Sequence, residues 1–407
     1  MSGEPLHLFS GIGLELEYMI VDSRTLEVLP IADRLLAAQA GELVGEVEVG
    51  ALRWSNELVL HVVELKTNGP AAATEGLTEV FQQGVTQVNT LLEGFGARLL
   101  PTAMHPWFDP RTQTRLWPHE NSQIYAAYNR IFGCRGHGWS NLQSAHINLP
   151  FCGDDEFGRL HAAIRLALPI LPAIAASSPV VDGRLSGALD TRLQLYRNNQ
   201  RAIPQITGQV IPEPAFSARE YQRQILQPIY KAIAGHDPEG ILREEWLNSR
   251  GAIARFERSA IEIRILDLQE CPAADVAIAD LISRLLNAMV DQRWSDYAEQ
   301  RRCNATPLAN LYNRVVIKGE RVLIEDSAYL DLFGYPGLSA TVAELWRHLA
   351  ESLYGSRLPE PLQLILDQGP LARRLLRALG GAPTQGRQRE LWLELAACLS
   401  EGRMFDA

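Results

Sequence analysis

Five glutamates stand inside apolar segments of this sequence, and they are the residues best suited to do chemistry. They occur in three separate stretches of the chain, as Glu15 and Glu17, Glu57 and Glu64, and Glu262. Burying a carboxylate is costly unless a cationic group meets it. Several carboxylates around divalent ions are typical of sites in which Mg²⁺ holds the phosphates of a nucleotide. The pattern therefore indicates a metal site at the centre of a sheet.

Glu15 and Glu17 are two residues apart in a segment that alternates in polarity from residue 13 to residue 21. Side chains two apart on a strand point to the same face, so both carboxylates can share one or two metal ions. The alternative is an exposed sheet face on which the glutamates meet water, as is common in antiparallel sheets. The pair alone does not decide between these interpretations.

Glu57 and Glu64 are seven residues apart, which places them on opposite faces of a regular strand unless a bulge or a strand start intervenes. Glu64 shares parity with Leu58, Leu60 and Val62, so its side chain is expected to follow an apolar face inward. This makes Glu64 the better metal ligand. Glu57 is either a further ligand or a surface residue at the start of the strand.

Two later segments carry the remaining candidates. His146 shares one face of a predicted strand with Ser144 and Asn148, where a lone histidine is more often a hydrogen-bonded structural residue than a ligand. Glu262 and Arg264 share one face of a strand whose other face is isoleucine. A carboxylate ligand beside a guanidinium suits a metal-phosphate site. The alternative is a cross-strand ion pair, worth little if exposed.

The periodicity of the chain predicts the elements that must position these residues. The sheet and its site are expected within residues 1–272, with mostly helical structure behind them. We divide the chain into a domain that carries the site, 1–300, and a mostly helical C-terminal extension packed on it, 301–407. The predicted strands are 13–21, 26–29, 58–66, 98–104, 140–149 and 260–266, the helices 32–39, 74–95, 160–176, 222–234 and 276–300, the long loop 105–122, and a hairpin 314–325 turning at 318–320.

Composition excludes several classes of protein. The 407 residues are 46% hydrophobic and 21% charged with a net charge of -10, and the basic residues are dispersed, so a nucleic-acid surface is not expected. Five cysteines without a CxxC pair fit a reducing cytoplasm. The N-terminus lacks the pattern of an export signal. The most apolar stretch, 166–181, is interrupted by three prolines and falls short of the about 20 residues of a membrane span. Oligomeric state is not indicated.

Motifs for holding phosphate or activating a nucleophile are missing. The chain has no GxxxxGK[ST] loop, no GxGxxG after a strand, no HExxH and no GxSxG. If the protein handles ATP, metal ions and arginines must therefore hold the phosphates in place of a glycine-rich loop.

Several segments together resemble the glutamate-cysteine ligase family, the carboxylate-amine ligases of the glutamine synthetase-like fold. They occur in the family's order over roughly residues 11–290, and this order makes the resemblance specific. Two positions depart from it, since Ser144 replaces the first glycine of one motif and Asn148 its second histidine. The segments are GLELE at 13–17 for the GxExE opening, Glu57-Leu58 with ELKT at 64–67 for the paired-glutamate segment, QSAHIN at 143–148 for the GxHVHVG strand, ASSP at 176–179 for the Ser-Ser-Pro turn, Thr191-Arg192, and EIRILD at 262–267 for the late ExRxxD strand.

The resemblance implies an α+β protein with a curved, mainly antiparallel sheet and helices on its outer side. It also implies an ATP- and Mg²⁺-dependent ligase for small molecules. A carboxylate, typically the γ-carboxylate of glutamate, would take the γ-phosphate of ATP, and an amine such as that of cysteine would then displace phosphate from the acyl phosphate. By the same resemblance, Glu15, Glu17, Glu64 and Glu262 hold the metal with Glu57 and His146 as further ligands, Arg264 and Arg192 meet the phosphates or the substrate carboxylate, and Arg264, His146 and Asn148 contact the nucleotide.

Other functions remain open from the sequence. A different amino acid, a small amine or a peptide terminus is an alternative acceptor. A second alternative is a non-catalytic member of the fold that binds a nucleotide or an amino acid. A third is a metal-dependent hydrolase, which would usually carry more histidine ligands than His146 alone.

Overall fold

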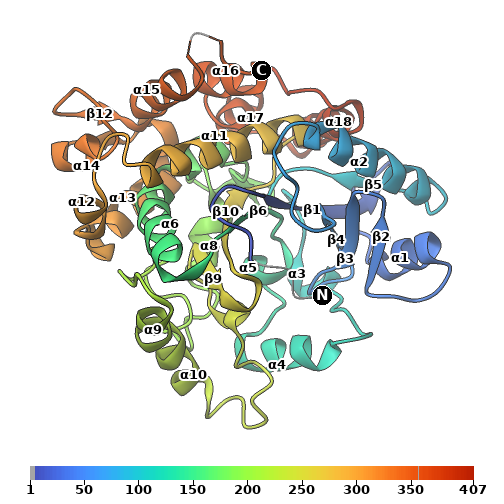
Figure 1. Ribbon diagram of the computed structural model, residues 1–407. Helices are drawn as coiled ribbons and strands as arrows, with labels where there is room; N and C mark the ends of the chain where they lie inside the picture. The colour runs from blue at the N-terminus through green and yellow to red at the C-terminus, as the bar shows by residue number, and fades with distance from the viewer. Residues whose placement is uncertain (1–4, 356) are drawn as a thin grey trace.

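An open antiparallel sheet lies at the centre of the computed structural model, which describes residues 5–355 and 357–407 (Figure 1). Its eight strands follow the order β2-β3-β4-β1-β6-β10-β9, with β5 paired to β1 beyond the end of β6. Every strand pair in this sheet is antiparallel. The strands are β1 (Gly13–Asp22), β2 (Glu46–Val49), β3 (Leu52–Asn56), β4 (Val62–Thr67), β5 (Ala97–Leu100), β6 (Ser144–Pro150), β9 (Ala252–Arg255) and β10 (Ala260–Asp267).

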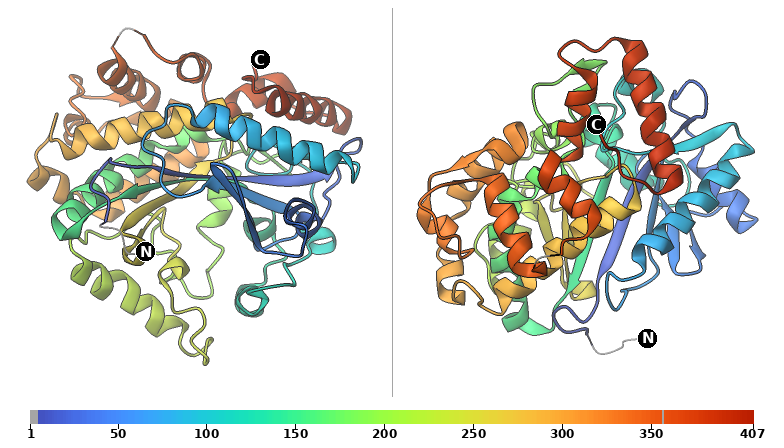
Figure 2. Two further views of the ribbon diagram at one scale, coloured as in Figure 1. Left: turned by 45° about the vertical axis from the view of Figure 1, so that its right-hand side comes forward. Right: turned by 90° about the horizontal axis from the view of Figure 1, so that it is seen from above.

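Helices cover one face of this sheet. Helices α2 (Leu77–Glu93), α11 (Pro272–Val290) and α18 (Gln385–Glu401) lie along the same side, as Figure 2 shows. In α2 the apolar residues recur at helical spacing, at Phe81, Val85, Val88 and Leu92, so one face of the helix is buried against the sheet. The opposite face of β1 is therefore the one left for Glu15 and Glu17.

That second face is flanked by two segments below the sheet in Figure 1. One contains α4 (Ser122–Phe132), and the other, 201–250, contains α9 (Ala218–Tyr221) and α10 (Gln227–Ile233). The two segments meet through aromatic rings, since the ring centroids of Tyr128 and Trp246 lie 6.0 Å apart. They form the walls of a space beneath the sheet.

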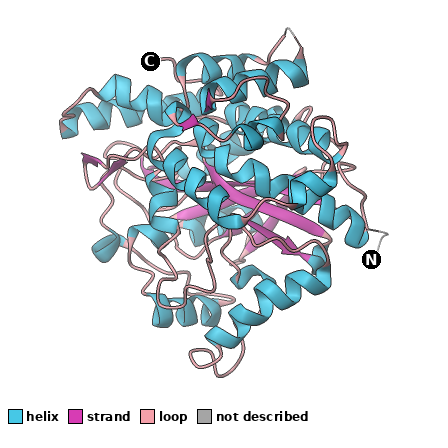
Figure 3. Ribbon diagram, turned by 90° about the vertical axis from the view of Figure 1, so that its left-hand side faces the viewer, coloured by secondary structure: helices cyan, strands magenta, loops and turns pink. Residues whose placement is uncertain are grey.

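The C-terminal helices pack on the helical layer, as the colours of Figure 2 show, and Figure 3 shows the strands lying among helices. A fully buried ion pair joins this region to the end of β10, where Arg374 Nη1 lies 2.5 Å from Glu270 Oε1. The boundary between the two predicted domains at residue 300 stays a prediction.

The remaining helices and strands lie outside the central sheet. They are α1 (Ala32–Ala40), α3 (Pro110–Gln113), α5 (His137–Ser140), α6 (Gly153–Ala167), α7 (Pro172–Ala175), β7 (Val180–Val181), β8 (Arg184–Leu185), α8 (Thr191–Tyr196), α12 (Tyr297–Arg301), α13 (Ala305–Lys318), β11 (Leu323–Ile324), α14 (Ser327–Asp331), β12 (Ala340–Thr341), α15 (Val342–Tyr354), α16 (Glu360–Gln368) and α17 (Leu371–Leu379).

The predicted fold class is confirmed, and several predicted elements are corrected. The hairpin at 314–325 is wrong, because 314–318 form the end of α13 and β11 pairs with β12 instead. The strand at 26–29 reduces to a single bridge between Val21 and Val28. The helix predicted at 276–300 ends at Val290, and the one at 160–176 breaks before the prolines at 169 and 172. The part of the chain that is described contains no helix long and apolar enough to cross a membrane.

Candidate active site

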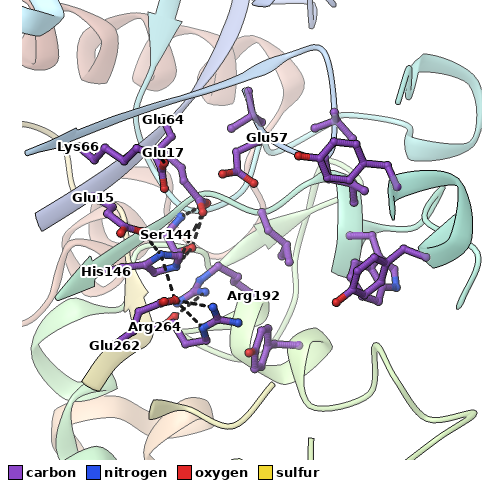
Figure 4. Close-up of a pocket in the computed structure, with 18 of the residues that line it drawn as sticks. Glu15, Glu17, Glu57, Glu64, Lys66, Ser144, His146, Arg192, Glu262 and Arg264 are labelled. Atoms are coloured by element: carbon purple, nitrogen blue, oxygen red, sulfur yellow. Dashed lines mark hydrogen bonds and ion pairs between the residues drawn. The ribbon is translucent and has the colours of Figure 1, made fainter. Parts of the chain in front are cut away.

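A cavity of about 350 Å³ opens on the face of the sheet away from α2. Figure 4 shows acidic and basic side chains from several strands converging on it. One part of its wall is charged and another is aromatic. Its lining includes Glu15, Glu17, Glu57, Glu64 and Glu262, the basic residues Lys66, His146, Arg192, Arg255, Arg258 and Arg264, and the aromatic residues Tyr125, Tyr128, Trp139 and Tyr196.

The strand register brings the predicted residues together. Directly paired residues of an antiparallel sheet project to the same face. Four neighbouring strands therefore present one continuous polar patch. The pairs are Glu15 with Lys66 and His146, Glu17 with Glu64, and Glu262 with Asn148.

His146 lies at the centre of the acidic side chains. Its Nδ1 is 3.0 Å from Glu15 Oε2 and 3.9 Å from Glu262 Oε1, and its Nε2 is 3.8 Å from Glu17 Oε1. Burial lowers the pKa of His146, but the hydrogen bond with Glu15 and the charges of Glu17, Glu15 and Glu262 outweigh burial and raise the pKa to about 9. In the metal-free protein the imidazolium is thus one of the cations that meet the carboxylates.

Glu64 and Lys66 form the second half of the charged wall. Lys66 Nζ lies 2.9 Å from Glu64 Oε2, which also accepts a hydrogen bond from Ser55 Oγ at 2.8 Å. Burial and the charge of Glu15 raise the pKa of Glu64 to about 7, against the opposing charge of Lys66. Burial also raises the pKa of Glu15, but its partner His146 reverses this and lowers it to about 2. The carboxyls of one site thus differ widely in proton affinity.

Glu57 reaches the same cavity from a loop. Strand β3 ends before it and β4 begins only at Val62, so Glu57 and Glu64 do not share a strand. The start of β4 thus intervenes between them, which is the exception to opposite faces that the sequence left open. The parity of Glu64 with Leu58 and Leu60 does not hold, because these two residues lie in the loop. Burial, followed by the charges of Glu64 and Glu17, raises the pKa of Glu57 well above its usual value.

Two sets of side chains have the geometry to hold a metal ion. Glu15, His146 and Glu262 form one set, and Glu17, Glu64 and His146 form the other, each with its ligand atoms within 4.8 Å of one another. Oxygen ligands with a single imidazole suit Mg²⁺ or Mn²⁺ better than the softer metals. The donor set therefore fits the ion that the sequence predicted, and the roles of these residues as ligands stay a prediction.

Arginines line the side of the cavity next to β10. Arg264 Nε donates to Glu262 Oε1 at 3.0 Å, and Arg255 Nη1 donates to Glu262 Oε2 at 3.4 Å. Burial raises the pKa of Glu262, but the charge of Arg264 dominates and the pKa is lowered. Arg192 is buried beside them and donates to Asp267. Both predicted arginines thus lie at the cavity.

Asn148 is not among the residues that line the cavity, whereas the lining includes several residues that the sequence did not single out. Asn148 Nδ2 donates to Glu15 Oε1 at 3.0 Å, so it orients a carboxylate, and its contact with a nucleotide stays a prediction. Lys66 was detectable, because it follows Glu64 by two residues on the same strand. Tyr125 and Tyr128, three apart on one face of α4, carried no comparable signal.

The sequence matches a known protein family. The model of glutamate-cysteine ligase family 2 (GCS2) matches residues 11–394. A protein of Archaeoglobus fulgidus described as uncharacterized is 38% identical over 281 residues, covering 69% of this chain and 75% of its own. A protein of Rubrobacter xylanophilus, provisionally named glutamate–cysteine ligase 2-3, is 26% identical over 331 residues, covering 79% of this chain and 82% of its own.

A solved structure shares the fold. The glutamate–cysteine ligase of Francisella tularensis, determined in complex with AMP, superposes with a TM-score of 0.58 at 12% identity, over 98% of this chain and 89% of that one. At 12% identity this match shows the fold alone, and the family is shown by the family model. The chain belongs to glutamate-cysteine ligase family 2, a family of carboxylate-amine ligases with the glutamine synthetase-like fold.

Proposed function

We propose that this protein is an ATP-dependent ligase that joins the γ-carboxylate of glutamate to an amine, such as the amino group of cysteine, through an acyl phosphate. One observation carries the proposal. Five carboxylates and a histidine from four neighbouring strands and one loop line the same cavity as three buried or half-buried arginines, Arg192, Arg255 and Arg264. Such an arrangement suits phosphoryl transfer, in which metal ions and cationic side chains neutralise the charge of the transferred group.

The acidic residues would hold Mg²⁺ against the nucleotide. Glu15, His146 and Glu262 offer one set of ligand atoms, and Glu17 and Glu64 with the other nitrogen of His146 offer the second. When bound, the metal neutralises phosphate charge and orients the nucleotide. For His146 to bind a metal it must first lose the proton that Glu15 and its neighbours favour.

Arginines and the aromatic wall would handle the other reactants. Arg264 and Arg192 line the cavity near β10, where they would meet anionic oxygens. Tyr125, Tyr128 and Trp139 offer an apolar surface beside Glu57 that suits the carbon skeleton of an amine. We propose that small molecules are the substrates, and the cytoplasmic location stays a prediction from the cysteine pattern.

The test is ADP release by the purified protein with ATP, glutamate and a panel of amines, with Mg²⁺ or with EDTA. Hydroxylamine should also trap the acyl phosphate as a γ-glutamyl hydroxamate, whatever the natural amine is. We expect Mg²⁺-dependent ADP release that at least one amine stimulates, and hydroxamate formation that requires glutamate. Glu360→Gln, at an exposed position on α16, is the matched control and should behave as the parent.

The same assay separates the alternatives. Turnover with cysteine would identify cysteine as the acceptor amine. Turnover with only another amine or a peptide would change the proposed acceptor and leave the proposed ligase reaction in place. Nucleotide binding without ADP release, and without hydroxamate at high protein concentration, would contradict the proposal and favour a binding protein.

A further inference from the structure

Strand β10 contains a β-bulge in the middle of the candidate site. Between Ile263 and Leu266 the strand gains one residue relative to its partner β6. Asp267 lies five positions after Glu262, so on a regular strand the two would point to opposite faces. The bulge turns Asp267 back, because it now pairs with Ser144, whose side chain lines the cavity. The backbone irregularity thus places Asp267 on the face of the active site.

Asp267 is fully engaged once it is there. It is 1% exposed, and its Oδ2 accepts hydrogen bonds from Ser177 N and Ser178 Oγ, each at 2.8 Å. Its Oδ1 accepts from Nε of Arg192. The Ser-Ser-Pro turn, the arginine of α8 and the last residue of β10, distant in sequence, thereby form one network.

The network fixes one edge of the Arg192 guanidinium and leaves another open. Arg192 is 1% exposed, its backbone N donates to Ser178 Oγ at 3.1 Å, and its Nη1 reaches the carbonyl oxygen of Arg264 at 3.4 Å. Its Nη2 has no acceptor among the residues that the structure describes. A buried guanidinium with an unfilled N–H edge is costly, so an anion arriving in the cavity would satisfy it.

Neighbouring charges indicate which anion this is. Arg192 is close enough to Glu17 for that carboxylate to favour its charged form, and it contacts the backbone of Arg264, the partner of Glu262. It therefore lies beside the candidate metal ligands. Phosphate oxygens held by metal ions at these carboxylates would be the anions within its reach. The terminal phosphate of the nucleotide, which is the group transferred, is the natural partner.

We infer that Asp267 is a positioning residue for phosphoryl transfer, which holds the guanidinium of Arg192 so that its free edge meets the terminal phosphate. The inference deepens the proposed function and rests on it for the identity of the anion. Asp190, which caps α8 through a hydrogen bond from Leu193 N at 2.8 Å, does not replace Asp267 as the ionised partner. Burial and the charge of Asp267 raise the pKa of Asp190 well above its usual value.

A double-mutant cycle tests this inference with Asp267→Asn, Arg192→Gln and their combination. The readout is the calorimetric affinity for an imidodiphosphate analogue of ATP and for ADP, both with Mg²⁺, so turnover is not required. We expect each single variant to weaken analogue binding about 10-fold while ADP binding changes less than about twofold, since only the analogue carries the terminal phosphate. The double variant should lose no more than Arg192→Gln alone, because Asp267 acts through that side chain.

Ser178→Ala is the milder companion, since it leaves every charge in place and removes one hydrogen bond to Asp267 together with the acceptor of the Arg192 backbone N. It should weaken analogue binding about threefold. In the ligase assay the same variants should lower kcat and leave the KM for the amine unchanged. A merely structural role would weaken ADP and analogue alike.

Three outcomes overturn the inference. The first is an Asp267→Asn protein that binds the analogue as the parent does, the second is losses that multiply in the double variant, and the third is an equal loss of affinity for ADP and for the analogue. The variants could lose affinity for the analogue but not for ADP, while the parent never releases ADP in the ligase assay. That result would leave the inference about Asp267 and the terminal phosphate standing and would refute the proposed ligase reaction. The two failures are therefore distinguishable.

Discussion

Replacing Glu64 by glutamine should stabilise the metal-free protein at alkaline pH. Glu64 is 5% exposed, and burial together with the charge of Glu15 raises its pKa from 4.5 to about 7. A carboxyl whose pKa is higher in the folded state adds stability below about pH 4.5 and loses it as the pH rises through about 7. The difference between 4.5 and about 7 corresponds to about 3 kcal/mol of unfolding free energy.

Glutamine removes the titration but keeps the shape of the side chain. Its amide oxygen can still accept from Ser55 Oγ and Lys66 Nζ, which both lie within 2.9 Å of Glu64 Oε2. We therefore expect Glu64→Gln to raise the unfolding free energy by about 1–3 kcal/mol at pH 8, allowing for a weaker bond to Lys66. Near pH 5 the difference should disappear or change sign, since the parent side chain is then mostly protonated.

The assay is urea unfolding in EDTA at pH 5 and pH 8, with Glu360→Gln as the control for removing an acid at an exposed position. With saturating Mg²⁺ the order at pH 8 should reverse, because the parent gains stability by binding the ion. A variant that is no more stable than the parent at pH 8 in EDTA would contradict this account, in which the buried carboxylates lower the stability of the metal-free protein and are retained because they bind the metal.

The remaining predictions concern one candidate metal ligand, two buried histidines and one buried ion pair. Glu262→Gln should lower Mg²⁺-dependent ADP release by about 100-fold while the protein stays folded by circular dichroism, and unchanged turnover would remove this residue from the mechanism. Burial lowers the pKa of His61 and of His105 from 6.5 to about 4, so each should cost about 3 kcal/mol of stability as the pH falls from about 6.5 to 4. Replacing both by glutamine should flatten that pH dependence in urea unfolding, and an equally steep profile would contradict it. Arg374→Met should lower the unfolding free energy by about 3–5 kcal/mol, because it leaves the fully buried Glu270 without its cation. Adding Glu270→Gln should recover much of this loss, and no recovery would count against the ion pair as its cause.

Much of the sheet was predictable because its strands alternate in polarity. The segments around Glu15, His146 and Glu262 carry the period of two that a half-buried strand requires, and β1, β6 and β10 lie there. Strands β2 and β3 were missed although the EVEV run at 46–49 alternates as well, because the run is only four residues long. The wrong hairpin arose from the glycine at 319, which ends a helix rather than turning a strand.

Convergence of the site was not derivable from periodicity. The pattern placed Glu15 and Glu17 on one face, but pairing with strands about 50 and about 130 residues away depends on register, which local sequence does not specify. The family resemblance supplied the missing grouping. It also grouped Glu57 with Glu64, which parity could not do because Glu57 reaches the cavity from a loop.

The contact between Asp267 and Arg192 lay beyond both kinds of reasoning. The spacing of the ExRxxD segment puts its aspartate on the wrong face of a regular strand, and only the bulge corrects this. A bulge depends on how two strands pair and on the packing around them, so it cannot be predicted from the sequence of one segment.

The most direct test of the shared metal site is anomalous diffraction from crystals grown with Mn²⁺ and ADP. We predict manganese peaks between the carboxylates of Glu15 and Glu262 and the imidazole of His146, and between Glu17 and Glu64, with phosphate oxygens on the same ions. Nucleotide bound with its phosphates away from these side chains, or manganese bound only at other acidic residues, would contradict the account.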